Sequence, residues 1–364
     1  MPDPNWIDDE PGLVELARRL QTAGRVAIDT EFLRERTFFP RLCLLQVAAE
    51  REIWCVDTLA LRLDALGPLL EAAPVSKLAH AARQDLEALH HAAGRIVAPV
   101  FDTQVAAACA GLKPQIGYAD LVRTLLGVSL DKAHTRTDWS KRPLSREQIS
   151  YAADDVRYLE EIASMLEERV RELGREAWVR KDCAALSDPR LYESDPDSAW
   201  ERLGGIARLE PAARVRAKAL AAWRERTAQQ RNLPRAWILP DAAIYEVAEA
   251  APADASELAR LRSMPTPYAA KFTDGLLGAL REAAATGDAD LEPARPARPT
   301  DAERAAMERM AKVLDSHAAE LGVSAEVLAT RGQIKALATG SRAVGALAGW
   351  RRAVIGERLL AVLE

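Results

Sequence analysis

The stretch Val26-Ala-Ile-Asp-Thr-Glu-Phe32 (VAIDTEF) has the composition of a β-strand, yet it carries two acids. Side chains alternate across a strand, so Asp29 and Glu31 share one face with Ala27. Like charges on one face repel each other, and burying them without a partner costs free energy. Two explanations are open at this point. The strand lies at a sheet edge with a wet outer face, or a cation is held between the two carboxylates.

The sequence around this strand predicts a mixed α/β sheet with flanking helices. A helix is expected over Glu10–Ala23, and strands over Cys43–Ala49 and Glu52–Asp57 are close enough to pair as antiparallel neighbours. Helical and strand patterns then alternate through LDALGPLLEAA, SKLAHA, RQDLEALHHA and RIVAPVFD. From Thr103 to Ala185 the pattern is almost entirely helical, with one polar interruption, LDKAHTRTDWSKRPLS. Antiparallel strands followed by βαβ units indicate a mixed sheet.

The remainder of the chain is helical, and it contains a repeat. After a Pro/Asp/Ser-rich linker, SDPRLYESDPDSA, the apolar positions of Leu233–Ala248 match those of Val323–Ala338 at an offset of 90 residues. The segment GDADLEPARPARPT between the two copies has the composition of an extended linker. We therefore expect two small helical domains after the α/β unit. The expected domains are residues 1–190, 205–287 and 300–364.

Composition excludes several classes of protein. The formal net charge of the 364-residue chain is −5, so any nucleic-acid binding needs a local basic patch. The four cysteines are scattered without a C-x-x-C pair, which argues against a zinc site or a disulfide framework. No apolar run approaches the roughly 20 residues of a membrane span, and MPDPNWIDDE is not a signal peptide. We expect a cytoplasmic, soluble monomer with no membrane contact and no obligate protein partner.

Further acids stand at positions that favour ligand binding. Asp85 opens the helix after strand SKLAHA, near the carboxyl end of a strand, although an acid there also stabilises the helix dipole. Tyr151 and Asp155 are four residues apart and share a helix face, which alone indicates a hydrogen bond or a solvated surface. Asp154 points about 100° away from that face.

Taken together, these residues give four carboxylates and a phenol. Oxygen-only ligands suit Mg²⁺ or Mn²⁺ and not zinc. Two such ions about 4 Å apart can activate a water, position a phosphate and stabilise a leaving oxygen. Several acids are needed because two dications require charge balance.

The same residues form three motifs that resemble a known superfamily. D-x-E in VAIDTEF, H-x4-D in HAARQD and Y-x3-D in YAADD resemble the exonuclease motifs of the DEDD superfamily, Tyr-type branch. The connecting segments DTEFLRERTFFPRLCLLQVA, FDTQVAAA, LDKAHTRTDWSKRPLS and YAADDVRYL resemble the ribonuclease D family. The resemblance covers the whole chain, because that family carries two HRDC (helicase and RNase D C-terminal) domains after the nuclease domain.

The resemblance implies a fold, an activity and a site. The fold would be an RNase H-like mixed sheet followed by two HRDC-like helical bundles. The activity would be 3′→5′ exoribonuclease cleavage that releases 5′-mononucleotides from RNA with a free single-stranded 3′ end, tRNA precursors above all. Asp29, Glu31, Asp85 and Asp155 would bind two divalent cations, Mg²⁺ or Mn²⁺, and Tyr151 would orient the attacking water. A DNA exonuclease of the same superfamily and a catalytically inert nucleic-acid-binding scaffold are the alternatives.

Candidate substrate contacts are less sharply defined. Gln46 and His80 are either substrate contacts or satisfied polar groups of the core, and Asp102 lies near the metals or caps a helix. The stretch Arg208–Ala236 holds eight Lys or Arg and two Glu, which makes it a candidate RNA footprint or a solubilising surface. In the polar interruption a cationic loop or an ordinary solvated loop is expected. The residues expected to contact substrate are Gln46, His80, Lys132, Arg214 and Lys218.

Overall fold

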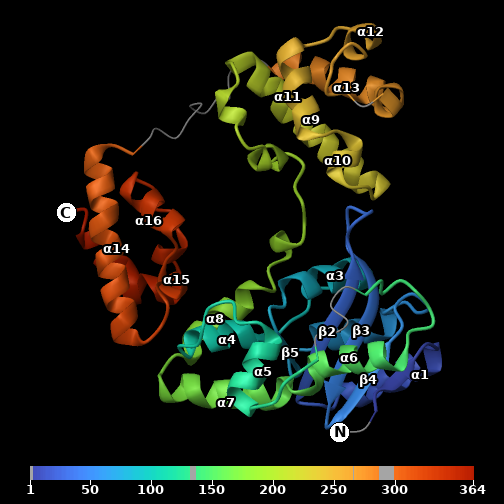
Figure 1. Ribbon diagram of the computed structural model, residues 1–364, viewed down its shortest axis with the longest axis vertical. Helices are drawn as coiled ribbons and strands as arrows, with labels where there is room; N and C mark the ends of the chain where they lie inside the picture. The colour runs from blue at the N-terminus through green and yellow to red at the C-terminus, as the bar shows by residue number, and fades with distance from the viewer. Residues whose placement is uncertain (1–2, 132–136, 265, 287–298) are drawn as a thin grey trace. The chain divides into compact units, whose positions relative to one another are not determined.

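A computed structural model describes residues 3–131, 137–264, 266–286 and 299–364. The chain divides into two compact units (Figure 1). The first unit comprises Met1–Leu33, Leu42–Pro189 and Pro299–Glu364. The second comprises Arg34–Arg41 and Arg190–Arg298. Within the described residues, no helix has the length and apolar character needed to cross a membrane.

The first unit is built on a six-stranded mixed sheet. The strand order is β1-β4-β3-β2-β5-β6, with β2 in the interior. Strand β4 is parallel to β1 and antiparallel to β3, whereas β2, β5 and β6 run parallel. The expected antiparallel pairing of the second and third predicted strands is confirmed, while the three-residue β1 was not expected. The strands are β1 (Asn5–Ile7), β2 (Arg25–Leu33), β3 (Arg41–Ala49), β4 (Glu52–Val56), β5 (Ser76–Ala79) and β6 (Val100–Asp102).

Helices connect these strands and cover the sheet. In Figure 1, α6 lies in front of the sheet at β2, β3 and β4. The interior position of β2 contradicts the edge-strand explanation for its acids, because β3 and β5 flank it on both sides. The helices of this part are α1 (Glu10–Leu20), α2 (Gly67–Glu71), α3 (Arg83–Ala93), α4 (Thr103–Cys109), α5 (Tyr118–Leu126), α6 (Arg146–Arg157), α7 (Leu159–Glu172) and α8 (Glu176–Ala185).

Helix α6 begins where its sequence predicts. The Ser145 hydroxyl accepts the Gln148 N–H, and the Gln148 side chain accepts the Ser145 N–H, so the helix starts with a capping box. Its inner face buries Ala152, Ala153 and Val156 against the sheet. This packing fixes which residues of α6 can face the strand that carries the two acids.

The second unit is a helical bundle around the long helix α9, with an apolar core formed by Leu220, Ile238, Ile244 and Leu276. Asn232 ends α9 in the left-handed conformation (φ 48°, ψ 48°), which asparagine tolerates better than most residues. Its helices are α9 (Pro211–Arg231), α10 (Arg235–Ile238), α11 (Asp241–Ala250), α12 (Ala255–Leu258) and α13 (Thr266–Thr286).

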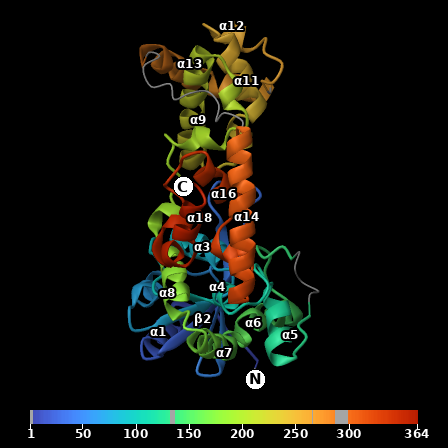
Figure 2. The same cartoon turned by 90° about the vertical axis from the view of Figure 1, so that its left-hand side faces the viewer.

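The first unit also contains a helical bundle, residues 300–364, which is called here the second bundle. Its long helix α14 lies beside α16 and α18 (Figure 2). Helices α14 and α15 begin and end 90 residues after α9 and α10, and α16 begins 90 residues after α11, in agreement with the repeat in the sequence. One apolar cluster joins this bundle to α4, α7 and α8. The helices are α14 (Asp301–Leu321), α15 (Ala325–Leu328), α16 (Arg331–Ala338), α17 (Gly349–Arg351) and α18 (Glu357–Ala361).

Candidate active site

Three elements carry the four carboxylates. Strand β2 supplies Asp29 and Glu31, the first turn of α3 supplies Asp85, and α6 supplies Asp155. All four side chains are half-buried. The carboxylates thus come from three segments that lie far apart in the sequence.

Helix α3 is held in place by a buried acid that precedes α4. The Asp102 carboxylate accepts the Ala81 N–H at 3.1 Å and the Ala82 N–H at 2.8 Å, directly before α3. It also accepts the Gln104 N–H at 2.7 Å as the N-cap of α4. Ala81 has a φ of 54°, a conformation that non-glycine residues rarely adopt. The N-cap alternative for Asp102 is therefore the observed one, and its second role is to fix the turn that positions Asp85.

Thr30 links β2 to α3. Its hydroxyl donates to the Asp85 carboxylate at 2.5 Å, and the hydroxyl-bearing side chain is almost fully buried. Alternation along the strand places Thr30 on the face opposite Asp29, so its sequence gives no sign of a contact with Asp85. This hydrogen bond fixes the orientation of the Asp85 carboxylate relative to β2.

The carboxylates raise one another's pKa values. Burial is the largest cause in each case. It raises the pKa of Glu31 to about 8, with added repulsion from Asp155 and Asp85. The pKa of Asp155 is raised to about 7 by burial, Asp154 and Asp85, and that of Asp85 to about 6. Asp29 is raised well above its ordinary pKa by burial and then by Asp85, Asp155 and Glu31. The site therefore holds more negative charge than its surroundings can stabilise.

This charge excess fits a site for divalent cations. Among the described residues, no three His, Cys, Asp or Glu side chains are already gathered closely enough to hold an ion. The Asp85 carboxylate is oriented toward the Thr30 hydroxyl. Oxygen donors alone are what Mg²⁺ and Mn²⁺ prefer, and bound dications would neutralise the surplus charge. The residues present therefore fit divalent metal ions.

Tyr151 faces the same group of acids. Burial raises its pKa to about 12, with further contributions from Asp155, Glu31 and Asp29, so the phenol stays protonated at neutral pH. Its ring stacks on the buried Trp139 at 6.2 Å between centroids. Trp139 therefore acts as a packing anchor that sets the position of the Tyr151 ring.

Asp154, the neighbour of Asp155, has a different partner. Its carboxylate accepts a hydrogen bond from the Arg157 guanidinium at 2.5 Å. The helical phase predicted from the sequence agrees with this arrangement, since Tyr151 and Asp155 approach the acids of β2 while Asp154 is paired along the helix. Asp154 still contributes to the raised pKa of Asp155.

Tyr118 is a site residue that sequence reasoning missed. Its hydroxyl donates to the Asp154 carbonyl at 3.1 Å and accepts the Tyr158 N–H at 3.1 Å, which holds the junction of α6 and α7. Burial raises its pKa, with Asp155 and Asp29 among the neighbouring charges. A pocket of about 280 Å³ extends from this ring to the acids of α6. Its lining includes Tyr118, Asp120, Asp131, Tyr151, Asp154 and Asp155.

Of two expected substrate contacts, Gln46 is buried and His80 is half-buried. The His80 ring nitrogens lie 2.9 Å from the Thr103 hydroxyl and 2.9 Å from the Ile116 carbonyl, so both nitrogens have protein partners. Burial lowers the pKa of His80, which favours the neutral ring. Gln46 is completely buried opposite Cys55 on the face that α6 covers. Neither end of its amide has a hydrogen-bond partner among the described residues.

The three basic residues expected to contact RNA differ in where the structure places them. Lys132 lies outside the described residues. Arg214 is buried, and its guanidinium donates to the Leu209 carbonyl at 3.1 Å, which removes it from the candidate RNA contacts. Lys218 is half-buried and lies 4.1 Å from the centroid of the Trp200 ring. Within the polar interruption, Arg142 forms a two-point ion pair with Asp57 (2.7 Å for each bond) and so anchors the entry to α6.

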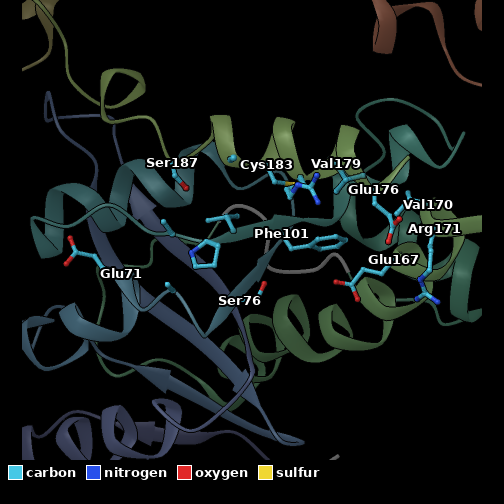
Figure 3. A pocket seen from close by; sticks show the side chains of 16 residues that line it. Glu71, Ser76, Phe101, Glu167, Val170, Arg171, Glu176, Val179, Cys183 and Ser187 are labelled. Carbon is cyan, nitrogen blue, oxygen red and sulfur yellow. The ribbon is translucent and has the colours of Figure 1, made fainter. Parts of the chain in front are cut away.

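A separate cavity of about 800 Å³ lies beside the short strand β6. Phe101, Val179 and Cys183 line it, with Glu71 and Glu167 at its sides (Figure 3). None of the four site carboxylates belongs to its lining. Size alone therefore does not locate the chemistry of this protein, and the acids around Tyr151 remain the candidate site.

Comparison with known proteins agrees with this geometry. The sequence matches the 3′–5′ exonuclease family model over residues 4–171 and the HRDC domain model over residues 213–280. Ribonuclease D of Gluconacetobacter diazotrophicus is 41% identical, with 100% of this chain and 93% of the relative covered. Ribonuclease D of Xanthomonas oryzae is 37% identical, with 99% of each chain covered.

A solved structure extends the likeness to three dimensions. Escherichia coli RNase D, described as an exoribonuclease involved in structured RNA processing, matches with a TM-score of 0.90 and 27% identity. The match covers 100% of this chain and 99% of that one. Identity near 40% over the full length, together with the same fold, leads to one conclusion: the chain belongs to the ribonuclease D family of 3′→5′ exoribonucleases.

Proposed function

We propose that Asp29, Glu31, Asp85 and Asp155 bind two divalent cations and that the chain removes nucleotides one at a time from RNA 3′ ends as 5′-monophosphates. The observation that carries this proposal is the placement of four carboxylates by β2, α3 and α6, with α3 joined to β2 by the Thr30–Asp85 hydrogen bond and α6 packed against β2. The carboxylates raise one another's pKa values, in agreement with this proximity. Such an arrangement is costly for a protein without a cation and suits one that binds them. The use of divalent ions is general among exonucleases of this type.

Each residue has a distinct part in the proposed reaction. When bound, divalent ions lower the pKa of water and stabilise the charge that develops on the leaving oxygen. Asp29 and Glu31 would bind the cations from the interior strand β2. Asp85 on α3 and Asp155 on α6 would supply the remaining carboxylate ligands. Tyr151 positions the attacking water through its hydroxyl. Because its pKa is about 12, it does not serve as the base at neutral pH.

The reaction is an in-line displacement at the last phosphodiester. The water oxygen forms a bond to phosphorus, and the bond from phosphorus to the 3′ oxygen of the preceding nucleotide breaks. The 3′ oxygen leaves with a proton, and the released nucleotide keeps a 5′-phosphate. Mg²⁺ and Mn²⁺ both satisfy an oxygen-only site, and either is expected to support cleavage.

The proposed natural substrates are structured RNAs with a single-stranded 3′ tail, including tRNA precursors. Escherichia coli RNase D, which shares this fold over its whole length, is described as acting in structured RNA processing. The helical bundle of the second unit matches the HRDC model. We propose that the bundle of residues 300–364 is a second domain of this type, on the basis of the 90-residue repeat in helix positions.

A direct test uses 3′-tailed RNA and the matching DNA with Mg²⁺, Mn²⁺ or EDTA. We expect stepwise shortening of the RNA, 5′-monophosphate products and complete inhibition by EDTA. Products without a 5′-phosphate would contradict the proposed displacement. Faster digestion of DNA than of RNA would favour the alternative of a DNA exonuclease.

A further inference from the structure

A loop that directly follows the catalytic strand is part of the second unit. Residues Arg34–Arg41 begin immediately after the end of β2 and group with the helical bundle. The amide oxygen of Asn232 accepts the N–H groups of Phe38 at 3.1 Å and Phe39 at 3.0 Å. Phe38 is buried in the core of this bundle, with the Arg235 guanidinium 4.4 Å from its ring centroid. The loop is therefore fixed to the corner between α9 and α10.

The charged side chains of this loop are exposed to solvent. Arg34, Arg36 and Arg41 are exposed, and Glu35 is the one acid among its eight residues. At the end of α9, Arg231 is exposed and lies 5.0 Å from the centroid of Phe272. Loop and helix end together present a basic surface.

An indole stands at the same corner. Trp237, five residues after Asn232, is 42% exposed, which is unusual for an aromatic side chain of this size. Among the described residues it is the one aromatic side chain in the set of exposed large apolar residues. A single exposed ring lacks the contiguous apolar core of a protein–protein interface.

The internal repeat shows how the equivalent corner is used in the other bundle. Val327 occupies the position 90 residues after Trp237, and it is only 7% exposed. It belongs to the apolar cluster that joins residues 300–364 to the nuclease helices. At this corner one bundle carries a buried valine and the other carries an exposed tryptophan, so a packing role does not account for Trp237.

We propose that the loop Arg34–Arg41 and the α9–α10 corner form one binding surface for single-stranded RNA, called here the corner surface. Its defining residues are Arg36, Arg231 and Trp237. The two guanidinium groups hold backbone phosphates, and the indole stacks on a base, the combination that favours single strands without strong sequence preference. The inference rests on the proposed exoribonuclease function and adds the place where the RNA outside the active site is gripped.

The loop of the corner surface is connected directly to the proposed metal-binding strand β2. The loop that carries Arg36 starts two residues after Phe32, and Phe32 directly follows Glu31. RNA bound at the corner surface is thus bound by the segment that continues from the proposed metal-binding strand.

The test measures RNA binding in the full-length chain carrying Asp29→Asn, which prevents degradation of the probe. The probe is a hairpin RNA with a single-stranded 3′ tail. Adding Trp237→Ala is expected to weaken binding about ten-fold or more, the usual loss for one stacking ring, and Trp237→Phe to retain most of the affinity. Adding Arg36→Ala with Arg231→Ala is expected to reduce the slope of log K against log salt by about 1.4.

Arg260→Ala is the matched control. Arg260 is exposed, belongs to the same unit and follows α12, which lies at the opposite end of this unit from α10 in Figure 1. This change is expected to leave affinity and salt slope as they were. Circular dichroism of each variant verifies that the fold is retained.

The outcomes separate the two proposals. If the unsubstituted chain shows no metal-dependent cleavage, the proposed function is wrong. If it cleaves RNA but Trp237→Ala binds the probe as tightly as its parent, the corner surface is wrong. A change in oligomeric mass on Trp237→Ala, with RNA affinity unchanged, would assign the corner to protein contacts and also overturn the inference.

Discussion

Asp29 is a half-buried acid with three other carboxylates as neighbours. Its pKa is raised by burial and by three neighbouring carboxylates. We expect Asp29→Asn to abolish cleavage, because one anionic ligand is lost, while RNA affinity stays within a few-fold. The metal-free variant is expected to melt at a higher temperature than the parent, because one repulsive charge is removed. Near-native turnover at saturating Mg²⁺ would contradict the site.

The same carboxylates make the metal-free protein sensitive to pH. The folded-state pKa values of Glu31, Asp155 and Asp85 are about 8, 7 and 6, whereas unfolded Glu and Asp titrate near pH 4. Between these limits the folded state binds more protons than the unfolded state, so stability falls as pH rises from about 4 to 8. Melting temperatures measured in EDTA across this range test the sign.

A variant and a metal provide the controls for that pH dependence. Asp155→Asn is expected to flatten the decline, because one of the elevated groups is gone. Adding Mg²⁺ is expected to restore stability most strongly near pH 8, where the carboxylates are charged. A metal-free protein whose stability increased over this range would show that the acids do not raise one another's pKa values.

Tyr151 and Asp154 differ by three positions on α6 and are expected to differ sharply in function. Tyr151→Phe removes the hydroxyl proposed to position water and is expected to lower kcat by roughly 10²-fold, with little change in metal affinity. Asp154→Asn removes a charge that is paired with Arg157 and is expected to alter kcat only slightly. Steady-state kinetics on a short RNA compare the two variants. If Asp154→Asn were inactive and Asp155→Asn active, the assignment of Asp155 as the α6 residue that faces the site would be wrong by one position.

The residue types at the site were predictable because they follow from local geometry. The alternation of a strand places Asp29 beside Glu31, and helical spacing places Tyr151 beside Asp155. Thr30 and Tyr118 were not predictable, since their roles depend on contacts made across the fold. Local periodicity contains no information about such contacts.

At the scale of elements, the turn before α3 depends on Asp102. Asp102→Asn keeps one carbonyl oxygen and loses an acceptor for the Ala82 N–H, so it is expected to reduce stability by about 1–3 kcal/mol. Displacement of Asp85 by about 1 Å is expected to lower kcat by up to roughly 10²-fold. Denaturant unfolding and steady-state kinetics measure the two effects.

Asp9→Ala is the control for that prediction. The Asp9 carboxylate accepts the Gly12 N–H at 2.9 Å as the N-cap of α1, and it holds no site residue. Its loss is expected to cost about 1 kcal/mol without a change in kcat. Equal kinetic effects of the two variants would show that Asp102 does not act through α3.

Element positions were largely readable from the sequence, with physical exceptions. Strands β3 and β4 and the 90-residue spacing of the helical repeats follow from hydrophobic period, which is a local property. The three-residue β1 was missed because its pairing with β4, rather than its own pattern, makes it a strand. The prediction of an RNA footprint over Arg208–Ala236 was wrong in part, because Arg214 and Arg224 are buried inside the bundle.

At the scale of the whole molecule, the division into units does not follow the order of the chain. Residues 300–364 share an apolar cluster with the nuclease helices, and Arg34–Arg41 belongs with the first helical bundle. Neither association has a local sequence signal. A chain that ends near Asp188 retains all five proposed catalytic residues but exposes the part of that cluster contributed by α4, α7 and α8. We therefore expect this fragment to melt well below the full chain, while any soluble fraction degrades short RNA with Mg²⁺.

The contact between the second bundle and α8 supplies the last prediction. Trp350 stacks on Trp178 with ring centroids 4.0 Å apart and donates its indole N–H to Asp182 at 3.0 Å. Arg351 adds two hydrogen bonds of 2.8 Å to the same carboxylate. Trp350→Ala removes a buried ring and is expected to lower the free energy of unfolding by about 3–5 kcal/mol in urea titrations. Trp237→Ala, which removes an exposed ring, is expected to stay within about 0.5 kcal/mol of the parent. Equal effects of the two tryptophan substitutions would show that the stacked pair does not hold the second bundle to the nuclease helices.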